Sequence, residues 1–239
     1  MVNYSGWSVI RKKLILFDID GTLILTGGVA ARSMAESVSE VLGMPISWKI
    51  SDFIGNTDRS IIHTLLHRSG ARESLIDEMT EQVLTLYLDK LKANLYKDGV
   101  VTVLPGVRKL LKILSEDDQF ALGLVTGNIV AGAQIKLSVK NLFGYFPIGA
   151  FGDDAINRDH LPPIAIQRAE KYYHHFFKNE DIWIVGDSVN DIYCAHSNHL
   201  KSLAVASGHM SRVELETSHP TAIMSDLSDV NRVIEIFKS

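Results

Sequence analysis

The chain has 239 residues, of which 46% are hydrophobic and 22% charged, a balance typical of folded globular proteins and unlike that of disordered or collagen-like chains. Twenty-four Lys and Arg residues against 28 Asp and Glu residues give a formal net charge of −4. No basic stripe is evident, so we expect no nucleic-acid partner. The acidic balance is unfavourable for an anionic ligand, and a site for such a ligand would have to overcome it.

Cys194 is the only cysteine, so the chain cannot form an intramolecular disulfide. The segment from Met1 to Lys13 lacks the apolar core of a secretory signal. The longest stretch without charged residues, Gln119 to Ile135, is too short and too polar to cross a membrane. We therefore expect a protein of the reducing cytoplasm with no membrane partner. The sequence gives no indication of an oligomeric state.

Short apolar runs closed by turn residues indicate strands that are buried on both faces of a parallel sheet. In chain order they are Leu14–Phe17, Phe120–Val125, a weaker run near Ile148, Ile182–Val185, Ser202–Ala206 and Thr221–Met224. Helical patterns alternate with them, first after Pro105-Gly106 and then at Ile129–Lys140, Pro163–His174, Asn190–Ser197 and Asp229–Phe237. This alternation predicts an α/β fold, a doubly wound, Rossmann-like parallel sheet.

The pattern changes between Leu25 and about Gly99, where no strand-like run occurs. Three apolar stripes at helical spacing predict three helices there, the first ended by Gly43 and the second by Gly70. We therefore predict an α/β core domain made of residues 1–24 and 100–239. A helical cap domain, residues 25–99, would be inserted after the first strand, with hinges near 23–28 and 98–105.

Polar residues follow three of the predicted strands. Asp18 and Asp20 follow the first strand, at the sheet edge where open α/β sheets bind ligands. Because like charges this close repel, one of the two carboxyl groups would be ionised and the other protonated, as acid–base catalysis requires. Two aspartates that merely begin a turn would show the same sequence pattern. Thr126-Gly127-Asn128 ends the second strand and opens into a helix whose free N-terminal amides would cradle a phosphate, or Thr126 or Asn128 would merely cap that helix.

A third such segment, Gly186-Asp187-Ser188-Val189-Asn190-Asp191, follows the strand at Ile182–Val185. Its two carboxylates, together with Asp18, would suit a hard cation such as Mg²⁺. In order and position, the three segments resemble the motifs of the haloacid dehalogenase-like (HAD) hydrolase superfamily. The insertion point and the Gly55-Asn56-Thr57-Asp58 segment resemble its helical-cap branch, which includes phosphoglycolate phosphatase and β-phosphoglucomutase.

The resemblance implies a role for each of these residues. Asp18 would be the nucleophile that forms an aspartyl-phosphate, and Asp20 the general acid and base. Thr126, Gly127 and Asn128 would bind the phosphoryl group. Mg²⁺ would be held by Asp18, the Asp20 carbonyl, Asp187 and Asp191, the last directly or through water.

One departure concerns the lysine that the family usually carries before the last motif. The corresponding segment runs from Asn157 to Pro163 and contains no lysine. We predict that Arg158 takes this role, both catalytic and substrate-binding, because a guanidinium is permanently charged and binds phosphate as a fork. His160 is the alternative.

The resemblance favours a Mg²⁺-dependent phosphatase for a small phosphorylated metabolite. The presence of Asp20 argues against a dehalogenase or a phosphonatase. A sugar-phosphate mutase of the β-phosphoglucomutase kind, or a non-catalytic phosphate-binding protein on the same scaffold, are the alternatives. We interpret His63 and His67 as a solvated pair and Cys194 as a core residue. Trp7 would either dock the N-terminal tail or mark a contact surface.

Overall fold

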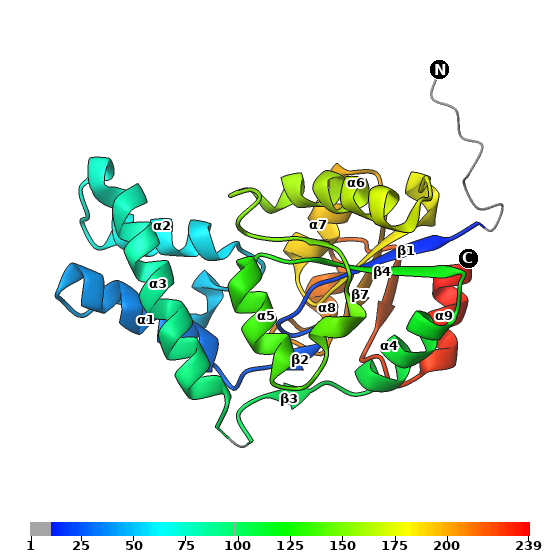
Figure 1. Ribbon diagram of the computed structural model, residues 1–239, viewed down its shortest axis with the longest axis horizontal. Coiled ribbons are helices and arrows are strands. Elements are labelled where there is room, and N and C mark those ends of the chain that lie inside the picture. Colours follow the sequence, from blue (N-terminus) through cyan, green and yellow to red (C-terminus); the bar gives the residue numbers. More distant parts are fainter. Residues whose placement is uncertain (1–10, 98) are drawn as a thin grey trace.

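The computed structural model describes residues 11–97 and 99–239, so the predictions for Trp7 and for Asp98 lie outside the described residues. Its centre is a parallel sheet of six strands in the order β5-β4-β1-β6-β7-β8 (Figure 1). The strands are β1 (Lys13–Phe17), β4 (Phe120–Val125), β5 (Gly149–Ala150), β6 (Ile182–Gly186), β7 (Lys201–Val205) and β8 (Ala222–Met224). The chain starts in the middle of the sheet and builds outward on both sides, which confirms the predicted doubly wound α/β fold.

Helices cover both faces of this sheet. They are α4 (Val107–Glu116), α5 (Val130–Ser138), α6 (Leu161–Tyr173), α7 (Val189–Ser197), α8 (Arg212–Glu216) and α9 (Val230–Lys238). Apolar side chains of α4, α5 and α9 form one core with one face of the sheet, and those of α6 and α7 form a second core with the other. Burial on both faces explains why β4 and β6 read as continuous apolar runs.

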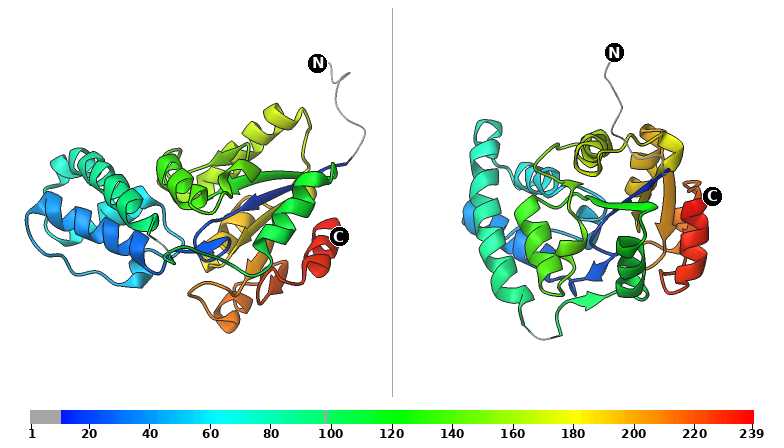
Figure 2. Two further views of the ribbon diagram at one scale, coloured as in Figure 1. Left: turned by 60° about the horizontal axis from the view of Figure 1, so that its bottom comes forward. Right: turned by 45° about the vertical axis from the view of Figure 1, so that its right-hand side comes forward.

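Three further helices lie to one side of the sheet, at the left of Figures 1 and 2. They are α1 (Val29–Leu42), α2 (Asp58–Arg68) and α3 (Ile76–Leu95), and α1 and α2 both pack on α3. Each of the three helices buries an apolar stripe, and Gly43 ends α1 with a left-handed φ of 67° that suits glycine. The helical character of this segment is confirmed, whereas its division from the core at residues 25 and 99 stays a prediction.

The connections to these helices differ from the prediction. Strand β2 (Ile24–Leu25) pairs antiparallel with β3 (Thr102–Val103), and the Leu104 amide also donates to the Leu23 carbonyl at 3.0 Å. Both segments fall where we predicted only hinges. Two-residue strands are too short to produce a period-2 pattern, so pairing between residues this far apart left no signal in the sequence.

Short 3₁₀ turns complete the chain, at Ile50–Asp52, Glu73–Leu75, Phe143–Tyr145, Arg158–His160 and Asn179–Asp181. Predicted strands and helices of the core agree with the structure to within two residues, but helix α8 was not predicted. Across the described part of the chain, no helix combines the length and apolar character that a membrane span needs.

Candidate active site

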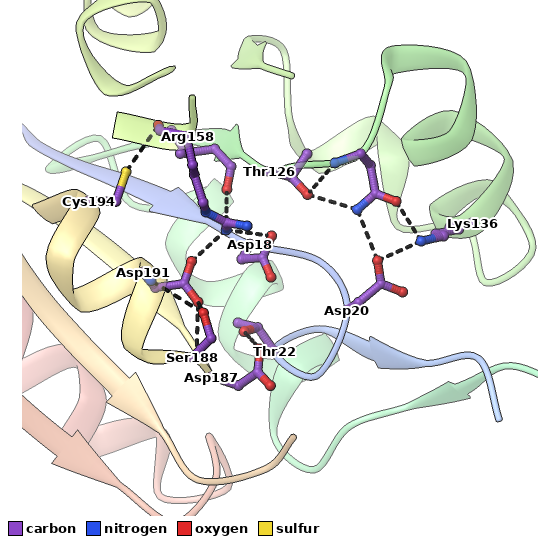
Figure 3. A network of polar contacts seen from close by, with 12 residues as sticks. Asp18, Asp20, Thr22, Thr126, Lys136, Arg158, Asp187, Ser188, Asp191 and Cys194 are labelled. Atoms are coloured by element: carbon purple, nitrogen blue, oxygen red, sulfur yellow. Dashed lines mark hydrogen bonds and ion pairs between the residues drawn. The ribbon is translucent and has the colours of Figure 1, made fainter. Parts of the chain in front are cut away.

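The carboxyl ends of three adjacent strands bring the predicted residues together (Figure 3). Asp18 follows β1, Thr126 follows β4 and Asp187 follows β6. Strands β4 and β6 are the two neighbours of β1, so segments more than 100 residues apart in sequence meet at one edge.

Asp18, Asp187 and Asp191 form a buried acidic cluster. Each offers an oxygen that lies within 4.8 Å of the others. Ser188 caps helix α7, and Asp191 completes the capping box by accepting from the Ser188 amide at 3.0 Å and from its hydroxyl at 2.6 Å. The Thr22 hydroxyl lies 3.4 Å from Asp187. The positions of these carboxylates are therefore set by the fold.

Burial dominates the titration of this cluster. It raises the pKa of Asp18 to about 6, even though the nearby Arg158 charge acts in the opposite direction. Burial and the charges of Asp191 and Asp18 raise the pKa of Asp187 well above its ordinary value. Like charges held this close in a buried site are unfavourable without a compensating cation.

Arg158 provides one such cation. Its Nη2 atom lies 2.9 Å from Oδ1 of Asp18 and 2.5 Å from Oδ1 of Asp191. Burial alone would lower the pKa of Arg158, but the charges of Asp191 and Asp18 outweigh it and raise that pKa. Its Nε atom is buried and has no partner among the described residues. His160, the alternative to Arg158, is exposed and does not line the cavity at the site.

Asp20 lies beside this cluster, and two side chains donate to the same one of its carboxylate oxygens. Asn128 donates to Oδ2 from its side-chain amide at 2.9 Å, and Lys136 donates from Nζ at 2.6 Å. Burial would lower the pKa of Lys136, but the charge of Asp20 and its hydrogen bond to the ammonium group outweigh burial and raise that pKa.

Sequence reasoning missed Lys136. The residue belongs to the buried face of α5, between Ala133 and Leu137 at helical spacing. A lysine at a core position of an amphipathic helix is unusual unless it is paired. That mismatch between residue type and position was the available signal.

The loop from Thr126 to Asn128 is compact and buried. The Thr126 hydroxyl accepts from the backbone amide of Asn128 at 3.3 Å and from its side-chain amide at 2.8 Å. Helix α5 begins only at Val130, with Ile129 as its N-cap. Two amides at this end have protein partners, since Ile129 donates to Asp58 at 2.9 Å and Val130 donates to Asp153 at 2.6 Å. Phosphate binding by this loop stays a prediction.

The segment before α2 contacts this loop directly. The Asp58 amide donates to the Gly127 carbonyl at 2.8 Å, and the Thr57 hydroxyl donates to the Ile156 carbonyl at 2.8 Å. A Cβ atom on Gly127 would lie 2.1 Å from the Asn56 carbonyl oxygen, so only glycine allows this approach. Burial raises the pKa of Asp58 to about 6. A cavity of about 260 Å³ remains between the sheet edge and helices α1 to α3.

The structure also places Cys194 and the pair of histidines, His63 and His67. Cys194 is buried in the core between α7 and the sheet, and burial raises the pKa of its thiol to about 12, as expected for a packing residue. His63 lies 3.9 Å from the exposed Glu73, and His67 is exposed. The acidic cluster is the one group of potential metal ligands found within residues 11–97 and 99–239, so the histidine pair stays a surface feature.

The fold and this arrangement of motifs define a class of protein. A model of the family described as haloacid dehalogenase-like hydrolase matches residues 15–205. The match covers most of the chain, and the chain therefore belongs to this family and is a hydrolase, as the motifs predicted.

Relatives are similar over nearly the whole length. A phosphoglycolate phosphatase of Mannheimia succiniciproducens is 28% identical, over 93% of this chain and 98% of its own. One from Vibrio vulnificus is 27% identical, over 93% and 96%. A crystal structure of a predicted phosphoglycolate phosphatase from Haemophilus somnus superposes with a TM-score of 0.70 at 21% identity, covering 95% of this chain and all of the other. That last likeness shows the shared fold.

Proposed function

We propose that this protein is a Mg²⁺-dependent phosphatase that hydrolyses a small-molecule phosphomonoester through an aspartyl-phosphate on Asp18. The observation that carries the proposal is the buried cluster of Asp18, Asp187 and Asp191 with Arg158. The phosphoglycolate phosphatases among its relatives support the reaction type. A location in the cytoplasm is part of the proposal and rests on the sequence.

The charges of the cluster fit a divalent cation. Three carboxylates face one guanidinium, which leaves an excess of two negative charges when all are ionised. Oxygen ligands of this kind suit Mg²⁺. Asp18, Asp187 and the Asp20 carbonyl would hold it. Both Asp191 oxygens already have protein partners, which favours contact through water. The ion would offset repulsion between the Asp18 carboxylate and the phosphate.

In the first step, a carboxylate oxygen of Asp18 attacks phosphorus, and the bond from phosphorus to the ester oxygen breaks. Asp20 gives its proton to the departing alkoxide, and an alcohol leaves. In the second step Asp20 takes a proton from water, the resulting hydroxide attacks phosphorus, and inorganic phosphate departs with Asp18 restored. Since Asn128 and Lys136 both donate to Oδ2 of Asp20, its Oδ1 is available to carry the transferred proton.

Arg158 and the loop after β4 would stabilise the phosphoryl oxygens. The buried, unpartnered Nε of Arg158 is a donor that a phosphoryl oxygen would satisfy. The Thr126 hydroxyl lies on the other side of Asp18 from Arg158 (Figure 3), and Gly127 and Asn128 follow it in the chain and line the same cavity. Donors placed before the reaction begins lower the cost of charge development on phosphorus.

Hydrolysis of p-nitrophenyl phosphate by the full chain tests the proposal. We expect release of nitrophenol that requires Mg²⁺, stops with chelator, and is lost in Asp18→Asn, which keeps the shape of the side chain. Thermal unfolding of that variant is the control for folding. Undiminished activity in Asp18→Asn or in chelator would overturn the proposal.

Two alternative functions predict other results. A sugar-phosphate mutase would isomerise β-glucose 1-phosphate and release little phosphate. A non-catalytic protein would bind phosphate and Mg²⁺ but turn over no ester in a broad panel.

A further inference from the structure

The cavity above Asp18 has two chemically different sides. The sheet edge contributes Asp18, Asp20, Asp187, Lys136 and Arg158. The opposite wall comes from helices α1 to α3 and the segments that join them to one another and to β2, and its large side chains are mostly apolar: Met34, Ile50, Phe53, Ile54, Ile61 and Tyr87.

This opposite wall has no cation among the described lining residues, and its one charged member is Asp58. Arg59, the next residue, lies elsewhere: it pairs with Glu81 at 2.5 Å, and Asp153 lies 4.0 Å from it. The wall that would face the part of a substrate beyond its phosphate is therefore apolar and acidic.

The two cations of the sheet edge are already paired. Arg158 contacts Asp18 and Asp191, and Lys136 contacts Asp20. The lining has four carboxyl groups against these two cations, and the exposed His209, from the loop after β7, is its one histidine among the described residues. A divalent ion would compensate for the excess charge of the cluster, but it would leave no unpaired lysine or arginine of the described lining for a second anionic group on the substrate.

From this distribution we infer that the substrate is the phosphate ester of a small, uncharged and partly apolar alcohol, and that a carboxylate-bearing ester such as phosphoglycolate is a poor substrate. The inference rests on the proposed phosphatase function and names its substrate class. A buried carboxylate without a cation is strongly disfavoured, and the site offers an apolar surface in its place.

A matched pair of esters tests the inference: phenyl phosphate and 4-carboxyphenyl phosphate, compared at saturating Mg²⁺, with butyl phosphate and phosphoglycolate as an aliphatic pair. We expect kcat/KM to be about 100-fold higher for the uncharged member of each pair, since an unpaired buried charge outweighs the small difference in leaving group. Equal values, or a preference for the carboxylates, would overturn the inference and leave the phosphatase function intact. No release of phosphate from any of the four would overturn both.

A charge placed in the wall gives an independent readout. Ile50 lines the cavity and is 40% exposed, so a lysine there can keep its ammonium group hydrated. In Ile50→Lys we expect the ratio of kcat/KM for 4-carboxyphenyl phosphate to that for phenyl phosphate to rise about fivefold, the size of a partly exposed ion pair. Ile50→Gln, matched in polarity without the charge, should leave the ratio unchanged. An unchanged ratio in Ile50→Lys, or an equal rise in Ile50→Gln, would contradict the assignment of this wall to the leaving group.

Discussion

The Nζ atom of Lys136 lies 2.6 Å from Oδ2 of Asp20. The lysine side chain that makes this contact is almost fully buried, on the inward face of helix α5. The contact joins the carboxylate proposed as general acid and base to a residue that belongs to none of the sequence motifs described above. It also leaves the second oxygen of Asp20 free of these donors.

Replacement of Lys136 by methionine should reduce kcat by about 100-fold, because Asp20 would lose the charged one of its two donors, and general acid–base catalysis contributes on this scale. Methionine has a similar length and suits the apolar surroundings. Steady-state kinetics with p-nitrophenyl phosphate measure the effect. Lys109→Met, in which the lysine is an exposed residue of α4, is the control. Wild-type kcat in Lys136→Met would show that Asp20 does not depend on this contact.

Replacement of Arg158 by methionine should lower both stability and activity. Asp18 and Asp191 would then lie buried without their cation, a change that typically costs about 3 kcal/mol or more of the free energy of unfolding. Urea denaturation in chelator measures this loss. His160→Gln, at the exposed alternative position, should stay within about 0.5 kcal/mol of the wild type. The reverse ranking of the two variants would assign the role of the missing lysine to His160.

Asp58 should make stability depend on pH in a sense opposite to that of a salt-bridged carboxylate. Its pKa is about 6 in the fold and near 3.8 when unfolded, so the folded state holds the proton more tightly, and stability falls as pH rises from about 4 to 6. Asparagine cannot ionise, so Asp58→Asn avoids the cost of a buried carboxylate. The variant should be more stable than the wild type by roughly 3 kcal/mol at pH 7, with little difference at pH 3.5.

Chemical denaturation of both proteins in chelator at the two pH values checks this. Asp89→Asn, at an exposed position of α3, is the matched control and should show no such dependence. A stability difference for Asp58→Asn that is the same at both pH values would contradict the buried, proton-binding state of this carboxyl group.

Cys194 should be unreactive in the native protein. Its side chain is buried and its pKa is raised to about 12 by burial, so almost no thiolate is accessible at neutral pH. A chromogenic disulfide reagent should titrate no thiol before denaturation and one per chain afterwards. Rapid reaction of the native protein would place this cysteine at the surface.

The site could be predicted from the sequence where polar residues come directly after a predicted strand. Apolar runs predicted buried parallel strands, and the carboxyl ends of adjacent parallel strands lie at one edge, so Asp18, Thr126 and Asp187 could be placed together in advance. Arg158 was preferred over His160 for its permanent charge and its fork of donors, and the structure puts Arg158 in contact with Asp18 and Asp191.

Long-range contacts from isolated side chains could not be predicted in this way. The contact between Lys136 and Asp20 depends on how α5 packs on the sheet, and the one between Asp58 and Ile129 depends on how the helical segment meets the core. Neither contact produces a local period or motif. The charge pattern of the cavity wall has the same origin, since it depends on which faces of α1 and α3 point inward.

The aspartyl-phosphate on Asp18 can be sought directly. Wild-type protein mixed with Mg²⁺ and a rapidly cleaved aryl phosphate, quenched in acid within milliseconds and digested, should yield a peptide that carries one added phosphoryl group at Asp18. The same peptide from Asp18→Asn should be unmodified. A burst of released phenol with no phosphoryl group on Asp18, or with the group on another residue, would contradict Asp18 as the nucleophile.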